Sequence, residues 1–182
     1  MTAFKFVFGM FLASAAVLSA QEEATPKYEI GFNYSGLHVS SSSDDRQRTG
    51  NGGSGTFEYN VNGMLGVVAD LGGYANTRFD NRLFTYMFGP RLNWRHSRLT
   101  PYVQALFGGA HLSYDFSGAS TTQNSFAFAT GGGVDYNLTK HISIKPIQVE
   151  YVMTRFDNTE GFGSHQNDVR YSAGVVFRLG ER

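Results

Sequence analysis

Hydrophobic and polar positions alternate with a period of two along most of the chain. In the segment 28–34, "YEIGFNY", aromatic or aliphatic residues occupy the even positions, and Glu, Gly and Asn occupy the odd positions. A β-strand points successive side chains to opposite faces, so this pattern predicts strands with one apolar and one polar face. The pattern predicts eight strands, over residues 27–40, 56–62, 64–74, 83–94, 100–114, 126–138, 142–151 and 168–179.

The seventh of these segments changes phase part-way along. Ile142 and Ile144 lie at even positions, but after Pro146 the apolar positions are odd, from Ile147 to Tyr151. One extra residue on one strand of an antiparallel pair has this effect, and proline is tolerated there because it has no N–H to donate. We therefore expect a β-bulge around Pro146.

The predicted strands are joined by connections that alternate between long and short. This order is typical of outer-membrane β-barrels, which have short turns on the periplasmic side and longer loops outside the cell. With an even number of strands, both termini are then expected on the periplasmic side. The predicted connections are 41–55, 62–63, 75–82, 95–98, 115–125, 139–141 and 155–167, of which the first contains the glycine-rich "GNGGSG", expected as a flexible loop.

The N-terminal residues have the features of a secretory signal peptide. Lys5 provides a positive start, Phe6 to Leu18 is apolar but too short to span a bilayer, and Ser19-Ala20 is a small-residue end. We expect a signal peptide over residues 1–20, a short segment over 21–26 and one barrel domain over 27–182. No later apolar run is long enough for a transmembrane helix.

Composition narrows the function classes. Without Lys5, the chain has fourteen Lys and Arg against fifteen Asp and Glu, so its charge gives no reason to expect nucleic-acid binding. There is no cysteine, which excludes disulfides, thiolate metal sites and a Cys nucleophile. Aromatic residues make up 15% of the chain, as expected if they form girdles at the two membrane interfaces.

A membrane setting also explains why the sheet should close. In hydrocarbon every backbone N–H and C=O must be paired, and an open sheet would leave two unpaired edges. A closed antiparallel up-and-down barrel of eight strands removes both edges. A soluble lipocalin-like barrel is the alternative from another class, but it would place the apolar residues inside and the polar residues outside.

Two segments carry a resemblance to a known family. The stretch "FATGGGVDYNLTKHISIKPIQVEYVMTRF" pairs a glycine-rich strand with an aliphatic return strand, and "NDVRYSAGVVFRLGER" looks like a closing strand. These segments resemble the OmpA-like outer-membrane β-barrel family in its small single-domain form. The resemblance implies an eight-stranded barrel in the bacterial outer membrane, in contact with membrane lipid and lipopolysaccharide and inserted by the barrel assembly machinery.

Charged side chains on the polar faces are the candidate functional residues. The interior of an eight-stranded barrel is only wide enough for its own side chains, and buried charges there must be paired. We interpret them as a structural plug, and the alternative is a narrow pore gated by rearrangement of the pairs. Strand order predicts that Glu29 pairs with Arg178, Asp70 with Arg91, Asp135 with Lys145, and Glu150 with Arg170.

An enzymatic interpretation rests on His111 and Ser113. Lipid A deacylases are small barrels with a His-x-Ser arrangement in which the His could deprotonate the Ser. Here the residue after Ser113 is Tyr114 where Asn is expected, and the nearest acid is Asp115. We therefore expect His111 to be an interfacial side chain and predict no catalytic residue. The histidines lack metal-ligand spacing, and no glycine run has a phosphate-loop ending, so no metal or cofactor is expected.

These inferences combine into one prediction. The chain is expected to be a monomeric, structural and surface-exposed outer-membrane barrel with a plugged polar lumen and loops available to an external ligand. A small porin-like channel is the first alternative, and an outer-membrane lipid-modifying enzyme follows it.

Overall fold

The protein folds into a single β-barrel of eight strands. The computed structural model describes residues 25–40, 48–76, 81–116, 119–155 and 166–181, so the expected signal peptide lies outside the described residues. The strands are β1 (Pro26–Ser40), β2 (Arg48–Asn60), β3 (Leu65–Asn76), β4 (Asn81–Asn93), β5 (Leu99–Phe116), β6 (Ala119–Asn137), β7 (Ile142–Arg155) and β8 (Gln166–Glu181).

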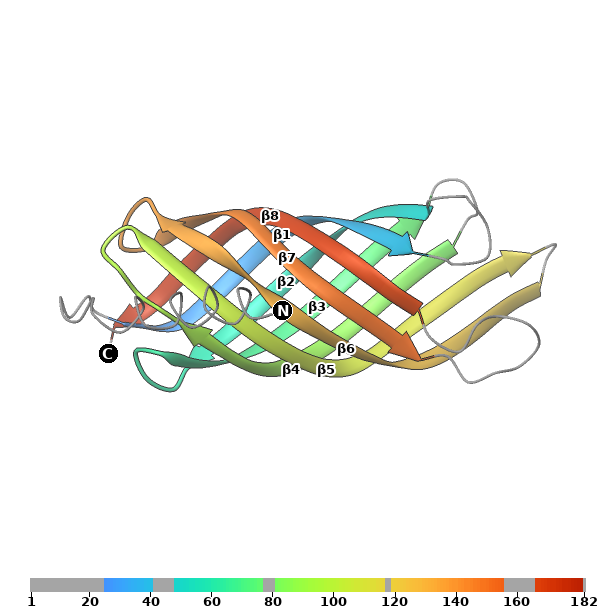
Figure 1. The fold of residues 1–182 in the computed structure, drawn as a ribbon, viewed down its shortest axis with the longest axis horizontal. Helices are drawn as coiled ribbons and strands as arrows, with labels where there is room; N and C mark the ends of the chain where they lie inside the picture. The colour runs from blue at the N-terminus through green and yellow to red at the C-terminus, as the bar shows by residue number, and fades with distance from the viewer. Residues whose placement is uncertain (1–24, 41–47, 77–80, 117–118, 156–165, 182) are drawn as a thin grey trace, which may run out of the picture.

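Each strand pairs antiparallel with the next along the chain, and β8 pairs with β1 to close the barrel. The closing pair is long, running from Pro26 opposite Glu181 to Ser40 opposite Asn167. Figure 1 shows the strands strongly tilted against the long axis of the barrel. The predicted closed up-and-down architecture is therefore confirmed. Each strand pairs with a neighbouring strand on both sides, so the sheet has no open edge.

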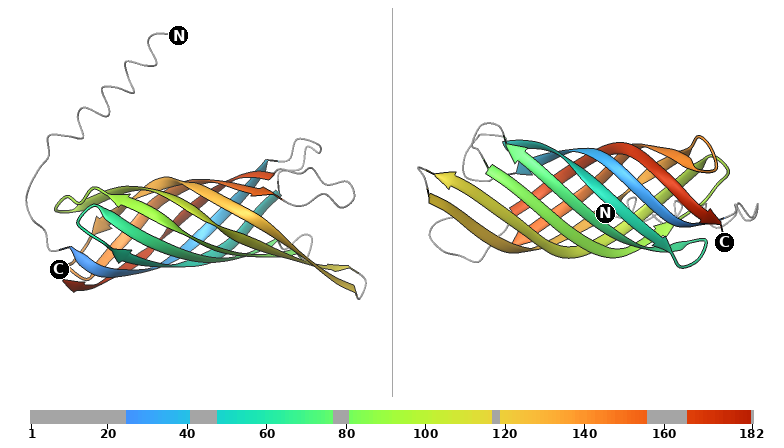
Figure 2. Two further views of the ribbon diagram at one scale, coloured as in Figure 1. Left: turned by 90° about the horizontal axis from the view of Figure 1, so that it is seen from below. Right: turned by 180° about the vertical axis from the view of Figure 1, so that it is seen from behind.

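The two ends of the barrel differ. At one end, which we call the short-turn end, β1 begins, β8 ends, and tight connections join β2 to β3, β4 to β5 and β6 to β7. At the other end, the far end, lie the remaining connections and a hairpin of β5 and β6 that extends beyond the neighbouring strands (Figures 1 and 2). Successive connections therefore lie at alternate ends, but the expected alternation of length is only partly present, because the connections 77–80 and 117–118 at the far end are no longer than the short turns.

Two predicted connections are wrong in extent. The glycine-rich segment from Gly50 to Gly55 is not a loop: it belongs to β2 and pairs with both β1 and β3. Its glycines conceal the strand pattern because they have no side chain to alternate. Likewise, most of the predicted loop from Asp115 to Ser125 is strand, since β5 and β6 stay paired as far as Phe116 opposite Ala119. Polar residues dominate there, which hid the apolar alternation.

The predicted irregularity in β7 is confirmed. The register between β7 and β8 shifts between Lys145 and Gln148, and the register between β6 and β7 shifts between Val134 and Tyr136. Pro146 and Ile147 are both exposed on the outer wall, while Lys145 and Gln148 are both buried inside. The extra residue thus keeps polar side chains in the lumen on both sides of the bulge.

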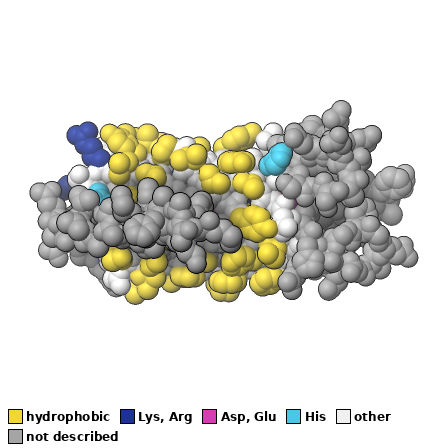
Figure 3. Space-filling model, viewed as in Figure 1, with side chains coloured by type: hydrophobic (Ala, Val, Ile, Leu, Met, Phe, Trp, Pro, Cys, Tyr) yellow, Lys and Arg dark blue, Asp and Glu magenta, His cyan; other side chains and the backbone are white. Residues whose placement is uncertain are grey.

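The outer wall carries a belt of large apolar side chains. Phe88 is 64% exposed and Phe32 is 61% exposed, and aliphatic and aromatic residues of every strand join them. Figure 3 shows this belt in yellow around the middle of the molecule. Residues 25–40, 48–76, 81–116, 119–155 and 166–181 contain no helix of the length and apolarity required to cross a membrane.

Candidate functional site in the barrel lumen

The lumen is lined by the polar positions of the alternating strands. Because neighbouring residues point to opposite faces, one phase of each strand sends its side chains inward. All eight charged residues predicted for the interior are buried there, each at most 6% exposed. They are Glu29, Asp70, Arg91, Asp135, Lys145, Glu150, Arg170 and Arg178.

Arg170 on β8 is the central cation of the lumen. Its Nε donates to Glu150 Oε2 at 2.7 Å, and its Nη1 donates to Asp70 Oδ1 at 3.0 Å and to the Tyr74 hydroxyl at 2.9 Å. Glu150 lies on the adjacent strand, directly opposite in register, whereas Asp70 lies on β3, three strands away around the wall. One guanidinium therefore ties two sides of the barrel together through the lumen.

A second ion pair joins β2 and β4. Arg91 Nη1 lies 2.7 Å from Glu58 Oε2, and the two residues face each other across β3. The β3 residue opposite Arg91 is Gly66, and a Cβ added there would collide with the Glu58 carboxylate. The missing side chain at Gly66 thus provides the space in which this pair forms. Glu58 was not among the predicted pairs, although glycine between two charged strands is a signal that could have indicated it.

The two ion pairs are linked into one hydrogen-bonded network. Gln104 accepts a hydrogen bond from Arg91 Nε at 2.8 Å and donates one to Glu150 Oε1 at 2.6 Å. Gln148 donates to Glu150 Oε2 at 2.6 Å and accepts from Lys145 Nζ at 3.0 Å. Amide side chains can donate and accept at once, so they bridge groups that are too far apart to pair directly.

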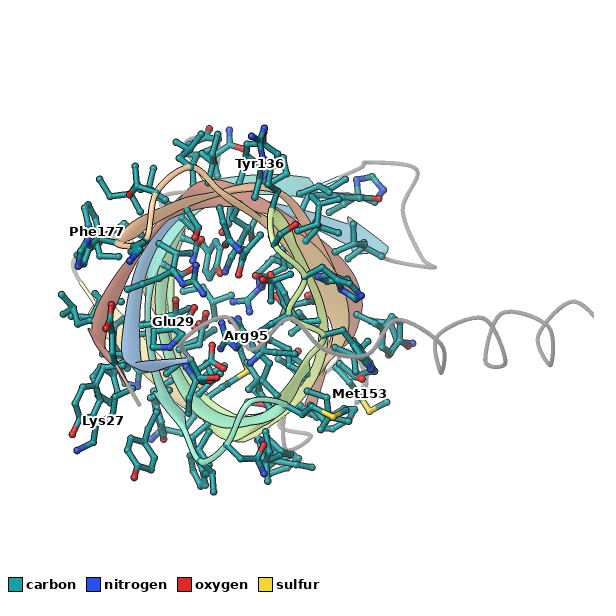
Figure 4. All side chains as sticks on the ribbon, turned by 90° about the vertical axis from the view of Figure 1, so that its left-hand side faces the viewer. Lys27, Glu29, Arg95, Tyr136, Met153 and Phe177 are labelled. Carbon is teal, nitrogen blue, oxygen red and sulfur yellow. The ribbon has the colours of Figure 1, made fainter. Side chains whose placement is uncertain are left out.

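At the short-turn end, the last member of the network is Arg95. This residue lies in the turn between β4 and β5, and its Nη2 reaches into the barrel to within 2.7 Å of Glu29 Oε1 and 2.9 Å of Asn60 Oδ1. Figure 4 looks into this end and shows Glu29 and Arg95 meeting inside the ring of strands, whereas Lys27 and Phe177 point outward. Sequence reasoning missed Arg95 because turn residues have no inward or outward phase.

Three of the four predicted pairs have other partners in the structure. Glu150 and Arg170 are paired as expected from strand order. Glu29 is a register partner of Arg178 but binds Arg95, and the Asp70 carboxylate binds Arg170 instead of Arg91. Strand order identifies which residues are neighbours in the wall of the barrel. Long side chains also reach across the lumen, and the closed barrel sets the distance between residues on its opposite sides.

Lys145 and Asp135 form no direct ion pair. Lys145 Nζ bonds to Gln148 and lies 5.4 Å from the centre of the Tyr102 ring, and Arg91 stacks on that ring at 4.0 Å. Within the part of the chain that the structure describes, Asp135 Oδ1 has no hydrogen-bond partner. The register between β6 and β7 shifts beside Asp135, so Asp135 and Lys145 are not register partners in the structure.

Apolar side chains fill part of the lumen wall. Val68, Met87, Leu106 and Val152 form a buried cluster with three inward alanines, Ala110, Ala127 and Ala129. Charged and apolar regions therefore lie side by side in the lumen, and together they fill the narrow interior.

His111 and Ser113, the pair considered for an enzymatic role, lie on β5. The Nδ1 of His111 is 2.7 Å from Asn124 Oδ1 on the facing strand, and Ser113 lies two residues further along. His111 is half-buried on the outer wall and not in the polar lumen. In the described residues, no group of three or more His, Cys, Asp or Glu is arranged to hold a metal ion.

A comparison with protein families identifies the chain. The family model described as an outer membrane protein beta-barrel domain matches residues 7–178, which is nearly the whole sequence. The chain belongs to this family. It is therefore an outer-membrane β-barrel protein of bacteria, with the apolar belt as its lipid-facing surface.

Solved structures of small outer-membrane barrels share the fold. Neisserial surface protein A superimposes with a TM-score of 0.69 at 18% identity, covering 86% of this chain and 100% of its own. The attachment invasion locus protein Ail of Yersinia pestis gives 0.60 at 15% identity, covering 85% and 99%. OprG of Pseudomonas aeruginosa gives 0.53 at 14%, covering 88% and 99%. No curated protein matches the sequence significantly.

Proposed function

We propose that this barrel is a structural outer-membrane protein with a closed, non-conducting lumen that presents its far end to the outside of the cell. The observation that supports a closed lumen best is the continuous polar network. It runs from Arg95 at the short-turn end through Asn60 and Asn93 to Glu58, Arg91, Gln104, Glu150 and Arg170. Its contacts are 2.6–2.9 Å, except for the bond of 3.5 Å between Asn93 and Asn60.

The network closes the lumen because its charged members are bonded to one another and are buried from solvent. Glu150 and Asp70 have no exposed surface, and Arg170 is 1% exposed. Opening a conducting path would require several of these charge-assisted bonds to break at once. Each broken bond would leave a buried charge without its partner, which is energetically costly. A structural role accounts for the same residues without such a step.

A small porin-like channel is the second candidate. The observation that favours it is the placement of Arg170 between two acids, Glu150 and Asp70, since a cation with two partners can exchange one for another. Planar-bilayer conductance of the refolded barrel tests both candidates, with Glu150→Ala measured in parallel. We expect a silent wild-type protein. Stable unitary openings that Glu150→Ala alters would establish the channel instead.

The orientation proposed is that both termini face the periplasm. The chain has no cysteine, so single cysteines can report on it without background. We expect a membrane-impermeant maleimide to label Ser120→Cys on whole cells and to leave Asn62→Cys unlabelled until the outer membrane is opened. Ser120 lies in the projecting hairpin and Asn62 in the turn after β2, so the opposite pattern would reverse the orientation.

We also propose that the barrel is monomeric, is not an enzyme and binds external ligands through its far end. The Ail protein of Yersinia pestis has been crystallised with the heparin analogue sucrose octasulfate, which supports a search for external ligands of this barrel too. The connections at the far end are the segments available for such binding. Loss of surface binding after deletion of the tip of the β5–β6 hairpin, with the barrel still folded, would identify one contact.

A further inference from the structure

Exposed basic side chains stand out at the short-turn end. Arg98, in the turn between β4 and β5, and Lys140, in the turn between β6 and β7, are both exposed. The acids Glu29 and Asp135 at this end are buried in the lumen, so Glu181 supplies the one exposed carboxylate among the side chains described here. Figure 3 shows dark-blue side chains at this end, just beyond the yellow belt.

The two turns that carry Arg98 and Lys140 are adjacent, and hydrogen bonds hold the backbone of each. The backbone N–H of Asn137 donates to the Arg98 carbonyl at 2.8 Å, which joins the first turn to the last residue of β6, where the second turn begins. Within the second turn, the Thr139 hydroxyl accepts from the Ile142 N–H at 3.0 Å. Both basic side chains are therefore displayed on a fixed backbone, and little ordering is required when they bind.

Both side chains border the lipid-facing belt. Leu99 directly follows Arg98 and is 48% exposed, and Leu138 lies two residues before Lys140 and is 55% exposed. A long basic side chain beside such residues lays its methylene groups along the apolar surface and directs its charge to the headgroup layer. The position therefore brings two positive charges to the level of lipid phosphates.

We propose that Arg98 and Lys140 form a binding site for the phosphate groups of anionic phospholipids in the leaflet around the short-turn end. The choice of phospholipid rests on the proposed orientation, in which this end faces the periplasm. Charge complementarity supports the proposal, since anionic headgroups attract basic residues beside a membrane span. The turn between β2 and β3, Val61 to Met64, carries no charge, so the site occupies one side of the barrel.

The protein contains a natural reporter for this site. Trp94 is the single tryptophan of the chain and lies in the same turn as Arg98. Brominated lipids quench tryptophan fluorescence at short range. The barrel is placed in phosphatidylcholine vesicles that contain a minor fraction of either brominated phosphatidylglycerol or brominated phosphatidylcholine. The ratio of Trp94 quenching in the two sets of vesicles shows which lipid is enriched beside Trp94.

We expect phosphatidylglycerol to be enriched about fivefold to thirtyfold over phosphatidylcholine near Trp94, since each of the two basic residues contributes about fivefold at an anionic surface. The double variant Arg98→Gln with Lys140→Gln should reduce the ratio to about one. It should still fold, because the hydrogen bond that joins the turns uses the Arg98 carbonyl and not its side chain. High salt should also lower the wild-type ratio.

Lys27→Gln is the matched control. It removes one positive charge at the same end, but Lys27 lies beside the β1–β8 seam, where Glu181 is the register partner of Pro26. The control should keep the enrichment at Trp94. Equal quenching by the two lipids in the wild type, or an equal loss in the control, would overturn the site. Stronger displacement of brominated lipid by lipopolysaccharide than by phosphatidylglycerol would show that the phosphate comes from the other leaflet.

Discussion

Replacing Arg170 by methionine tests whether the lumen network stabilises the barrel. Arg170 is 1% exposed and donates to Glu150, Asp70 and Tyr74. Methionine fills a similar volume but leaves both carboxylates buried without their cation. Breaking a buried ion pair from one side costs about 3–5 kcal/mol. At a slope of about 2 kcal/mol per M urea, the unfolding midpoint should fall by about 2 M.

The assay is urea unfolding of the refolded barrel in phosphatidylcholine vesicles, followed by Trp94 fluorescence. Glu150→Gln and the double variant Glu150→Gln with Arg170→Met complete a double-mutant cycle. Since removal of both charges leaves only Asp70 uncompensated, the double variant should lose about 1–3 kcal/mol less than the sum of the single losses. Strictly additive losses, or a loss below about 1 kcal/mol for Arg170→Met, would refute the role assigned to Arg170.

Two further predictions concern the wall of the barrel. Gly174→Ala should destabilise by about 1–3 kcal/mol because its Cβ would collide with the Phe32 carbonyl, whereas Gly73→Ala, with open space around it, should change stability by less than about 0.5 kcal/mol. Phe88→Arg in the belt should cost about 2–4 kcal/mol, but Leu138→Arg beside the short turns only about 0–1 kcal/mol. The same urea titration measures all four; equal losses within either pair would contradict the placement of those residues.

The sequence determined the architecture because the membrane imposes a simple rule on it. Strands that face lipid on one side and a polar lumen on the other must alternate, and this alternation predicted eight strands and the bulge at Pro146. The rule failed where the residues do not alternate between apolar and polar side chains. The glycines from Gly50 to Gly55 and the polar residues of the β5–β6 hairpin were read as loops.

Only the closed barrel decided how the interior charges pair. The sequence identified which acids and bases face inward, and neighbours in the wall predicted the contact of Glu150 with Arg170. The other contacts depend on geometry across the lumen: Arg170 reaches Asp70 from three strands away, and Arg95 enters from a turn. Such distances depend on strand tilt and stagger around the closed sheet, and these properties belong to the whole barrel and not to any one strand.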